Sequence, residues 1–155
     1  YEISACLVGS EMCIRDRRLG MSLADTYRQV WSSARGHWRV SPQTRYIVPS
    51  RFGYCPFVFR VAEGGWRRDS FEGSHDRFMA TEGYWIDVER ERLIHLGAPD
   101  PHDAWLPTAR VAAEAPTEED LAVARVLSGK IIALGAGQKN ITIRLRQKNR
   151  TLNFD

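Results

Sequence analysis

Residues 45–66 read RYIVPSRFGYCPFVFRVAEGGW, and this stretch decides the fold class. Aromatic and β-branched residues gather in two short runs, at 46–48 and 57–61, and Pro, Ser and Gly separate the runs. Runs of this length and composition, bounded by turn-forming residues, are typical of β-strands. Gly64 and Gly65 predict a turn before Trp66. We therefore expect short strands connected by turns in this part of the chain.

A helix is predicted before these strands. Apolar side chains recur at three- and four-residue spacing over residues 22–34, and Ser22 is the expected N-cap. We expect this helix to bury Trp31, together with Tyr27 and Val30, against the sheet that follows.

A second helix is predicted near the other end of the chain. Thr117 followed by Asp120 is typical of a capping box, with acidic residues in the first turn. The helix is expected from Glu118 to about Ser128, and Gly129 is expected to end it.

Further strands are predicted at 77–86, 89–96, 130–134 and 141–145. The last two are interpreted as a hairpin joined by a Gly-rich loop, and residues 97–116 as a long surface connection with a short element at 108–112. The prediction is one α+β domain over residues 18–155: a small curved, mostly antiparallel sheet, or a partly open barrel, that carries two helices.

The first seventeen residues, YEISACLVGSEMCIRDR, resemble the translation of the index-bearing adapter used in transposase-based sequencing libraries. The resemblance implies that residues 1–17 are a non-native, adapter-derived segment of a metagenomic fragment. It also implies that the gene fragment begins where a transposon cut. Either Met21 is the true start, or it is internal to a longer protein whose N-terminal part is missing.

Composition narrows the class of protein. The formal charge is +3; residues 1–17 hold three acidic and two basic side chains, so the remainder carries about +4. Of the three cysteines only Cys55 lies outside the adapter-like segment, which argues against a disulfide framework and a cysteine-rich zinc site. We expect a cytoplasmic protein without a cofactor, and the apolar runs are too short to predict a membrane span.

Basic side chains are interleaved with tryptophans along the chain. Guanidinium groups neutralise phosphates and flat rings stack on unpaired bases, so this combination favours DNA or RNA as the partner. The alternative interpretation places the tryptophans in the core and the arginines on an ordinary solvated face. The candidate nucleic-acid-binding residues are Arg35, His37, Trp38, Arg39, Trp66, Arg67, Arg68, Lys139, Arg144 and Arg146.

Two other functions stay open from the residues alone. Asp100, His102 and Asp103 form a tight cluster that a small hydrolase would use as a metal site or general base, if the side chains converge in a pocket. A protein-interaction module would instead show an apolar surface patch and weak salt dependence. Cys55, in an apolar strand, is interpreted as a buried hydrophobe, and no catalytic residue is assigned.

The order of several short motifs resembles the accessory module that accompanies GIY-YIG nuclease domains. The motifs are Tyr27 and Trp31, RGHWRV at 35–40, VFRV at 58–61 with Trp66, SGK at 128–130, and GQKNI at 137–141. The chain departs from the family pattern because Pro does not follow Asn140 and no helix-rich insert is recognisable between the strands. It also lacks the nuclease motif and its catalytic Arg and Glu.

The resemblance implies a non-catalytic, nucleic-acid-facing companion of a nuclease encoded upstream or in a separate gene. The features are also similar to small barrel modules of the PUA-like kind, which bind nucleic acid in a concave face.

Overall fold

The structure is a computed structural model that describes residues 2–9, 25–36, 38, 40–50, 54–69, 77–131, 140–148 and 151–154. The following statements concern these residues. They form an α+β fold with two helices and mostly antiparallel strands, and the main sheet is not closed into a barrel. Neither helix has the length and apolar character that crossing a membrane would require.

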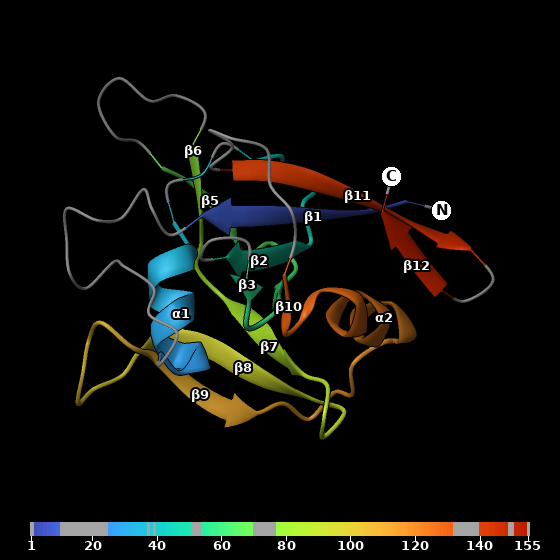
Figure 1. The fold of residues 1–155 in the computed structure, drawn as a ribbon. Coiled ribbons are helices and arrows are strands. Elements are labelled where there is room, and N and C mark those ends of the chain that lie inside the picture. The colour runs from blue at the N-terminus through green and yellow to red at the C-terminus, as the bar shows by residue number, and fades with distance from the viewer. Residues whose placement is uncertain are drawn as a thin grey trace.

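The main sheet has eight strands in the order β12-β11-β1-β2-β4-β7-β8-β9 (Figure 1). Two smaller sheets pair β3 with β10 and β5 with β6. Among the described pairs only β1 and β2 run parallel. The strands are β1 Glu2–Gly9, β2 Tyr46–Ser50, β3 Tyr54–Cys55, β4 Phe59–Val61, β5 Trp66–Asp69, β6 Arg77–Ala80, β7 Gly83–Asp87, β8 Arg92–Pro99, β9 Pro107–Val111, β10 Lys130–Ile131, β11 Asn140–Lys148 and β12 Thr151–Phe154.

Helix α1 spans Tyr27–Ala34. Thr26 caps it through a capping box with Gln29, so the helix begins later than predicted; the expected cap, Ser22, lies outside the described residues. Trp31 is 1% exposed and its ring lies 5.3 Å from that of Phe59, so the predicted burial of this residue is confirmed. Tyr27 stacks on the Trp85 ring at 4.3 Å.

Helix α2 spans Glu118–Leu127 and confirms the capping box predicted from Thr117 and Asp120. The Asp120 amide donates to the Thr117 hydroxyl at 3.1 Å, and the Thr117 amide donates to the Asp120 carboxylate at 3.0 Å. Gly129 follows the helix with φ of +70°, a backbone conformation that glycine adopts without steric cost.

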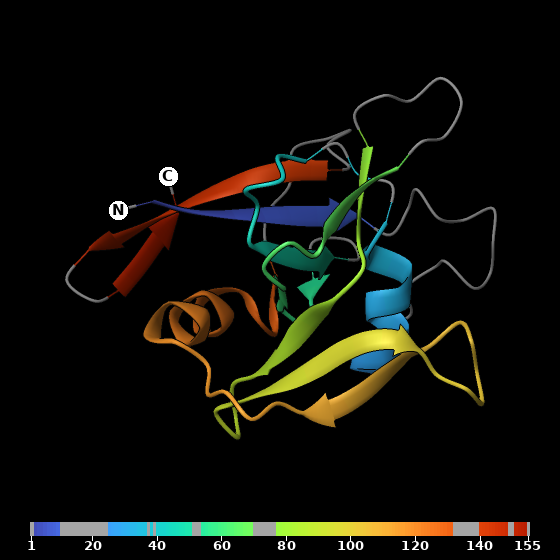
Figure 2. The same ribbon diagram turned by 180° about the vertical axis from the view of Figure 1, so that it is seen from behind.

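The two helices cover opposite faces of the sheet. Neighbouring residues of a strand point to opposite faces, and in β2 the side chain of Tyr46 packs with α2 while that of Ile47 packs with α1. Figures 1 and 2 show β2 and β7 between the two helices. Each face therefore has its own apolar core, one centred on Leu127 and one on Trp31.

Two predicted elements differ from the structure, and one further element is confirmed. The expected strand at 77–86 is two strands, because β6 pairs with β5 while β7 joins the main sheet. The short element expected at 108–112 within the connection over 97–116 is confirmed as β9, the edge strand of the main sheet, which pairs with β8. The predicted hairpin is also wrong, because β10 pairs with β3 whereas β11 pairs with β1 and β12.

Strand β1 belongs to the segment that resembles a library adapter. It pairs with β11 in antiparallel and with β2 in parallel orientation, so it lies inside the sheet. The foreign origin of residues 1–17 stays a prediction, and the position of β1 makes it testable.

Candidate nucleic-acid interface

Five strands place polar and aromatic residues directly opposite one another. The register pairs Tyr46 with Arg60, Arg60 with Tyr84, Tyr84 with His95 and His95 with Arg110. Because directly paired residues share a sheet face, these five residues form a line across β2, β4, β7, β8 and β9, which we call the transverse row. The row lies on the face that α2 partly covers.

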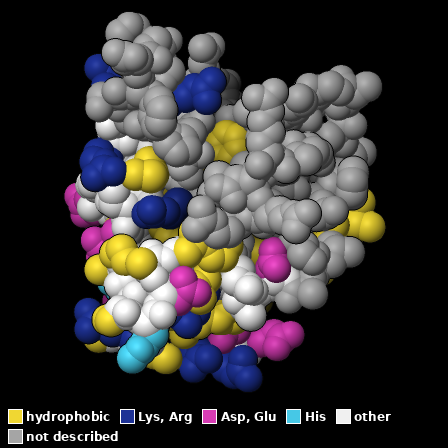
Figure 3. Space-filling view, turned by 90° about the vertical axis from the view of Figure 1, so that its left-hand side faces the viewer, with side chains coloured by type: hydrophobic (Ala, Val, Ile, Leu, Met, Phe, Trp, Pro, Cys, Tyr) yellow, Lys and Arg dark blue, Asp and Glu magenta, His cyan; other side chains and the backbone are white. Residues whose placement is uncertain are grey.

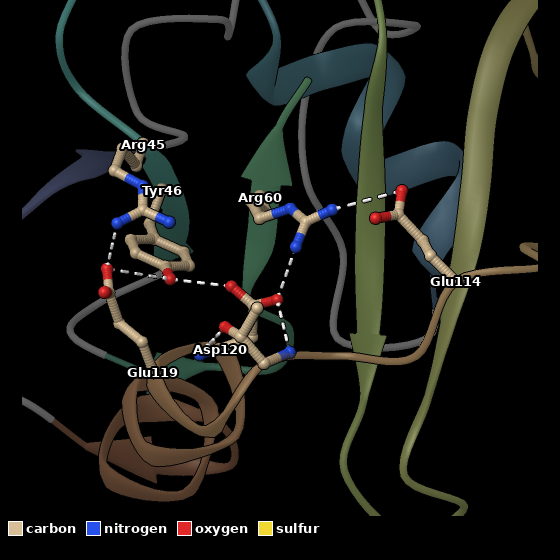
Figure 4. Close-up of polar contacts among 7 residues, drawn as sticks. Arg45, Tyr46, Arg60, Glu114, Glu119 and Asp120 are labelled. Atoms are coloured by element: carbon tan, nitrogen blue, oxygen red, sulfur yellow. Dashed lines mark hydrogen bonds and ion pairs between the residues drawn. The ribbon is translucent and has the colours of Figure 1, made fainter. Parts of the chain in front are cut away.

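The N-terminus of α2 holds the inner end of the row. Asp120 is fully buried, and its carboxylate accepts from the Tyr46 hydroxyl at 2.7 Å and from Arg60 Nη1 at 2.5 Å. Figure 4 shows both donors converging on this carboxylate. Since the Thr117 amide also donates to it, the buried charge has a complete set of partners.

Further charges extend this network towards solvent. Glu119 pairs with Arg45 and accepts from the Tyr46 hydroxyl at 3.3 Å, and Glu114 lies 3.4 Å from Arg60 (Figure 4). Burial, followed by the hydrogen bond to Asp120, raises the pKa of Tyr46 far above its ordinary value. The network contains no free nucleophile, and we interpret it as a brace between α2 and the sheet.

The outer end of the row is more open. The Arg60 guanidinium lies 4.7 Å from the centre of the Tyr84 ring, and the Tyr84 and His95 rings meet edge to face at 5.4 Å. Burial, and after it a hydrogen bond to Glu114, raises the pKa of Tyr84. A hollow of about 590 Å³ lies over Tyr84, His95 and Arg110 at this end. Another, of about 540 Å³, lies beside Arg45, Arg60 and Trp66, nearer the inner end of the row.

A second group of basic residues lies where α1 ends against the β5–β6 hairpin. Arg67 pairs with Met79 across the hairpin, so by alternation Arg67, Met79 and Arg77 share one face. The end of α1 reaches this hairpin, because the Ala80 amide donates to the Arg35 carbonyl at 2.7 Å. On this side of the molecule several Lys and Arg side chains reach the surface among hydrophobic ones (Figure 3). We call Arg35, Arg67 and Arg77 the basic face.

The electrostatics of the basic face are unfavourable in the unbound protein. Burial, and after it the positive charge of Arg67, lowers the pKa of Arg35. The buried Nε atom of Arg77 has no hydrogen-bond partner. Among the side chains that the structure describes, which do not include that of Asp69 opposite Arg77, no carboxylate forms an ion pair with any of these three arginines.

The structure separates the predicted nucleic-acid residues. Arg35 and Arg67 lie close together, and Arg68 is exposed at the same hairpin, with its guanidinium 5.9 Å from the Phe78 ring. Trp66 is half-buried beside a hollow, with its indole nitrogen donating to the Thr44 carbonyl.

The structure corrects the prediction that Trp38 binds nucleic acid. It is 4% exposed and its indole nitrogen bonds the Ala34 carbonyl, so its ring presents no face for stacking and belongs to the core. His37, Arg39 and Lys139 lie outside the described residues. Arg144 and Arg146 lie on β11, whose side chains are not described.

The Asp100 and Asp103 side chains organise their own loop, and His102 takes part through its backbone amide. Asp100 accepts from the His102 amide at 2.8 Å and from Arg28 at 2.6 Å, and Asp103 accepts from the Trp105 amide at 3.1 Å. No group of three metal-ligating side chains is found in the described part of the chain. Cys55 is buried, and burial raises the pKa of its thiol to about 12, as the interpretation of a structural cysteine requires.

The sequence analysis did not identify the transverse row. Arg60 stands between Phe59 and Val61, both buried, and His95 between Ile94 and Leu96, both buried. The signal in the sequence that could have indicated the row was therefore a single polar residue inside an apolar strand. Its partners, however, depend on a register that connects five strands.

Comparison with known proteins found no matching family model, no matching curated protein and no matching solved structure.

Proposed function

We propose that this chain is a nucleic-acid-binding accessory domain without catalytic residues of its own, and that the basic face contacts phosphates. The observation that carries the proposal is the position of Arg35 against the hairpin that bears Arg67, where the Ala80 amide donates to the Arg35 carbonyl. Burial, and after it the charge of Arg67, lowers the pKa of Arg35 there. Like charges held close together favour an anionic ligand, since phosphate oxygens relieve the repulsion and accept from guanidinium donors.

Other arginines of the domain support this interpretation by contrast. Arg28, Arg60 and Arg92 each pair with an aspartate, and Arg125 pairs with Glu91. These arginines are neutralised within the fold. No ion pair among the described side chains involves the basic face, so we assign its arginines to an external partner.

The sequence resemblance supports the same class of partner. It favours a role beside a nuclease, in which this domain holds the DNA or RNA and another polypeptide cleaves it. The local geometry at Asp100 favours the binding role over hydrolysis, because both aspartates of that cluster accept backbone N–H groups.

A salt titration tests the proposal. DNA and RNA oligonucleotides should bind the full chain with an affinity that falls steeply as salt rises. Arg67→Gln should reduce the slope of log affinity against log salt by about one unit. Arg125→Gln is the matched control, because Arg125 is also exposed but is already paired with Glu91.

No binding at low salt would refute the proposal. An equal change of slope in Arg67→Gln and Arg125→Gln would also refute it, because the attraction would then come from net charge and not from the basic face.

A further inference from the structure

The hollow at the outer end of the transverse row has the composition of a binding site. It has a volume of about 590 Å³ and lies among β7, β8, β9 and the segment before α2. Its polar lining consists of Glu82, Tyr84, His95, Arg110 and Glu114. We call it the outer hollow.

Two aromatic rings form part of its wall. Tyr84 and His95 are directly paired across β7 and β8, and both rings are only partly buried. His95 Nε2 lies 2.5 Å from a Glu82 oxygen, which holds the imidazole in place. Gly97 leaves room for this ring, because a side chain there would begin 2.8 Å from the imidazole carbon Cε1. The Tyr84 and His95 rings would therefore offer a flat ligand contact surfaces in fixed positions.

The charged groups of the outer hollow are complementary to a nucleotide. Glu82 and Glu114 provide carboxylate oxygens that only accept hydrogen bonds when ionised. Arg110 is exposed and directly paired with His95, so it lies at the same end of the row. Acceptors, rings and one cation therefore gather in a single hollow.

We propose that the outer hollow binds one unpaired nucleobase that carries an exocyclic amino group. The base would lie against Tyr84 and His95, its amino group would donate to Glu82 or Glu114, and Arg110 would contact the neighbouring phosphate. Carboxylates discriminate in this way because cytosine and adenine present an amino donor, whereas thymine and uracil present carbonyl oxygens at the equivalent positions. This inference rests on the proposed function and assigns it a base preference.

The outer hollow adjoins the hairpin that carries the basic face. The Thr81 amide donates to the Gly65 carbonyl at 2.8 Å, immediately before Trp66 begins β5, and Glu82 follows Thr81 into the hollow. Glu82 therefore connects the outer hollow to the root of the hairpin that carries Arg67.

The experiment compares oligodeoxycytidine with oligothymidine of equal length, which carry the same phosphate charge. At one salt concentration the full chain should bind oligodeoxycytidine at least about fivefold more tightly, as expected for one good base contact. Glu82→Ala should reduce this ratio towards one, and Glu82→Gln, which retains an acceptor oxygen, should restore part of it. Glu89→Gln, an exposed change in the turn between β7 and β8, is the control and should leave the ratio unchanged.

The outcomes separate the two proposals. Equal affinity for both oligomers, with a steep salt dependence that Arg67→Gln reduces, would overturn the base site and leave the basic face in place. Tighter binding of oligothymidine would also overturn it. Binding of neither oligomer would refute the proposed function and the base site together.

Discussion

The Tyr46 hydroxyl donates to the Asp120 carboxylate at 2.7 Å, although the two residues are 74 positions apart in the chain. Tyr46 is the first residue of β2 and Asp120 lies in the first turn of α2, so this one bond connects the helix to the sheet. The same carboxylate also accepts a hydrogen bond from Arg60, and it caps its own helix by accepting from the Thr117 amide. Three kinds of interaction therefore depend on a single side chain.

Asp120→Ala should strongly destabilise the domain. The substitution removes the buried partner of Arg60 and leaves the Tyr46 hydroxyl with only its longer contact to Glu119. We expect the free energy of unfolding to fall by about 3–5 kcal/mol in urea denaturation. Glu118→Ala, at an exposed position in the same helical turn, should cost less than about 1 kcal/mol. Similar losses in the two variants would show that the network does not brace the fold.

Gly83→Ala should destabilise the domain by overpacking. A Cβ atom at this position would lie 2.6 Å from Trp31 Cη2 and 2.7 Å from the Arg60 carbonyl oxygen. We expect a loss of about 1–3 kcal/mol in urea denaturation. Adding Trp31→Phe removes the crowded ring atoms, so the two substitutions should be non-additive. Strict additivity would mean that the Trp31 ring is not what excludes a side chain at residue 83.

Arg28→Gln should raise the pKa of Asp100. In the folded protein that pKa is low, first because the His102 amide donates to the carboxylate and second because Arg28 does. A carboxylate whose pKa is lower in the folded than in the unfolded state stabilises the fold at pH values above the unfolded-state pKa. This stabilisation is lost as the pH falls through the folded-state pKa. The Arg28→Gln variant should therefore complete the loss of this stabilisation at a higher pH than the unsubstituted protein. A carbon-13 NMR titration of the Asp100 carboxyl measures the shift, and Arg125→Gln should leave it unchanged.

Removal of residues 1–17 should leave a folded domain. Because β1 is parallel to β2 and antiparallel to β11, β11 is already antiparallel to β2. We expect β11 to pair directly with β2 in the shortened chain, and the free energy of unfolding to stay within about 1 kcal/mol. Urea denaturation measures the stability, and NMR contacts between the β2 and β11 backbones report the pairing. A chain that fails to unfold cooperatively would show that β1 is an essential strand.

The sequence predicted the local parts of the molecule. The Thr117–Asp120 capping box is confirmed because its hydrogen bonds join residues three positions apart, and the burial of Trp31 follows from helical spacing. The fold class, both ends of α2 and the C-terminal end of α1 belong to this local information. The start of α1 at Tyr27 does not, because the sequence predicted it at Ser22. The break between β6 and β7 was not predicted. Residues 77–86 have the pattern of one strand, but the first half pairs in one sheet and the second half in another.

What only the tertiary structure decided is which distant residues meet. The sequence indicates that Trp38 is aromatic and near arginines, but burial among α1 and β6 makes it a core residue. The transverse row exists because four strand pairings bring Tyr46, Arg60, Tyr84, His95 and Arg110 into register. A strand records in its own sequence which residues share a face, since side chains alternate. It does not record its neighbour or register, because the backbone hydrogen bonds that join strands are the same for every residue except proline.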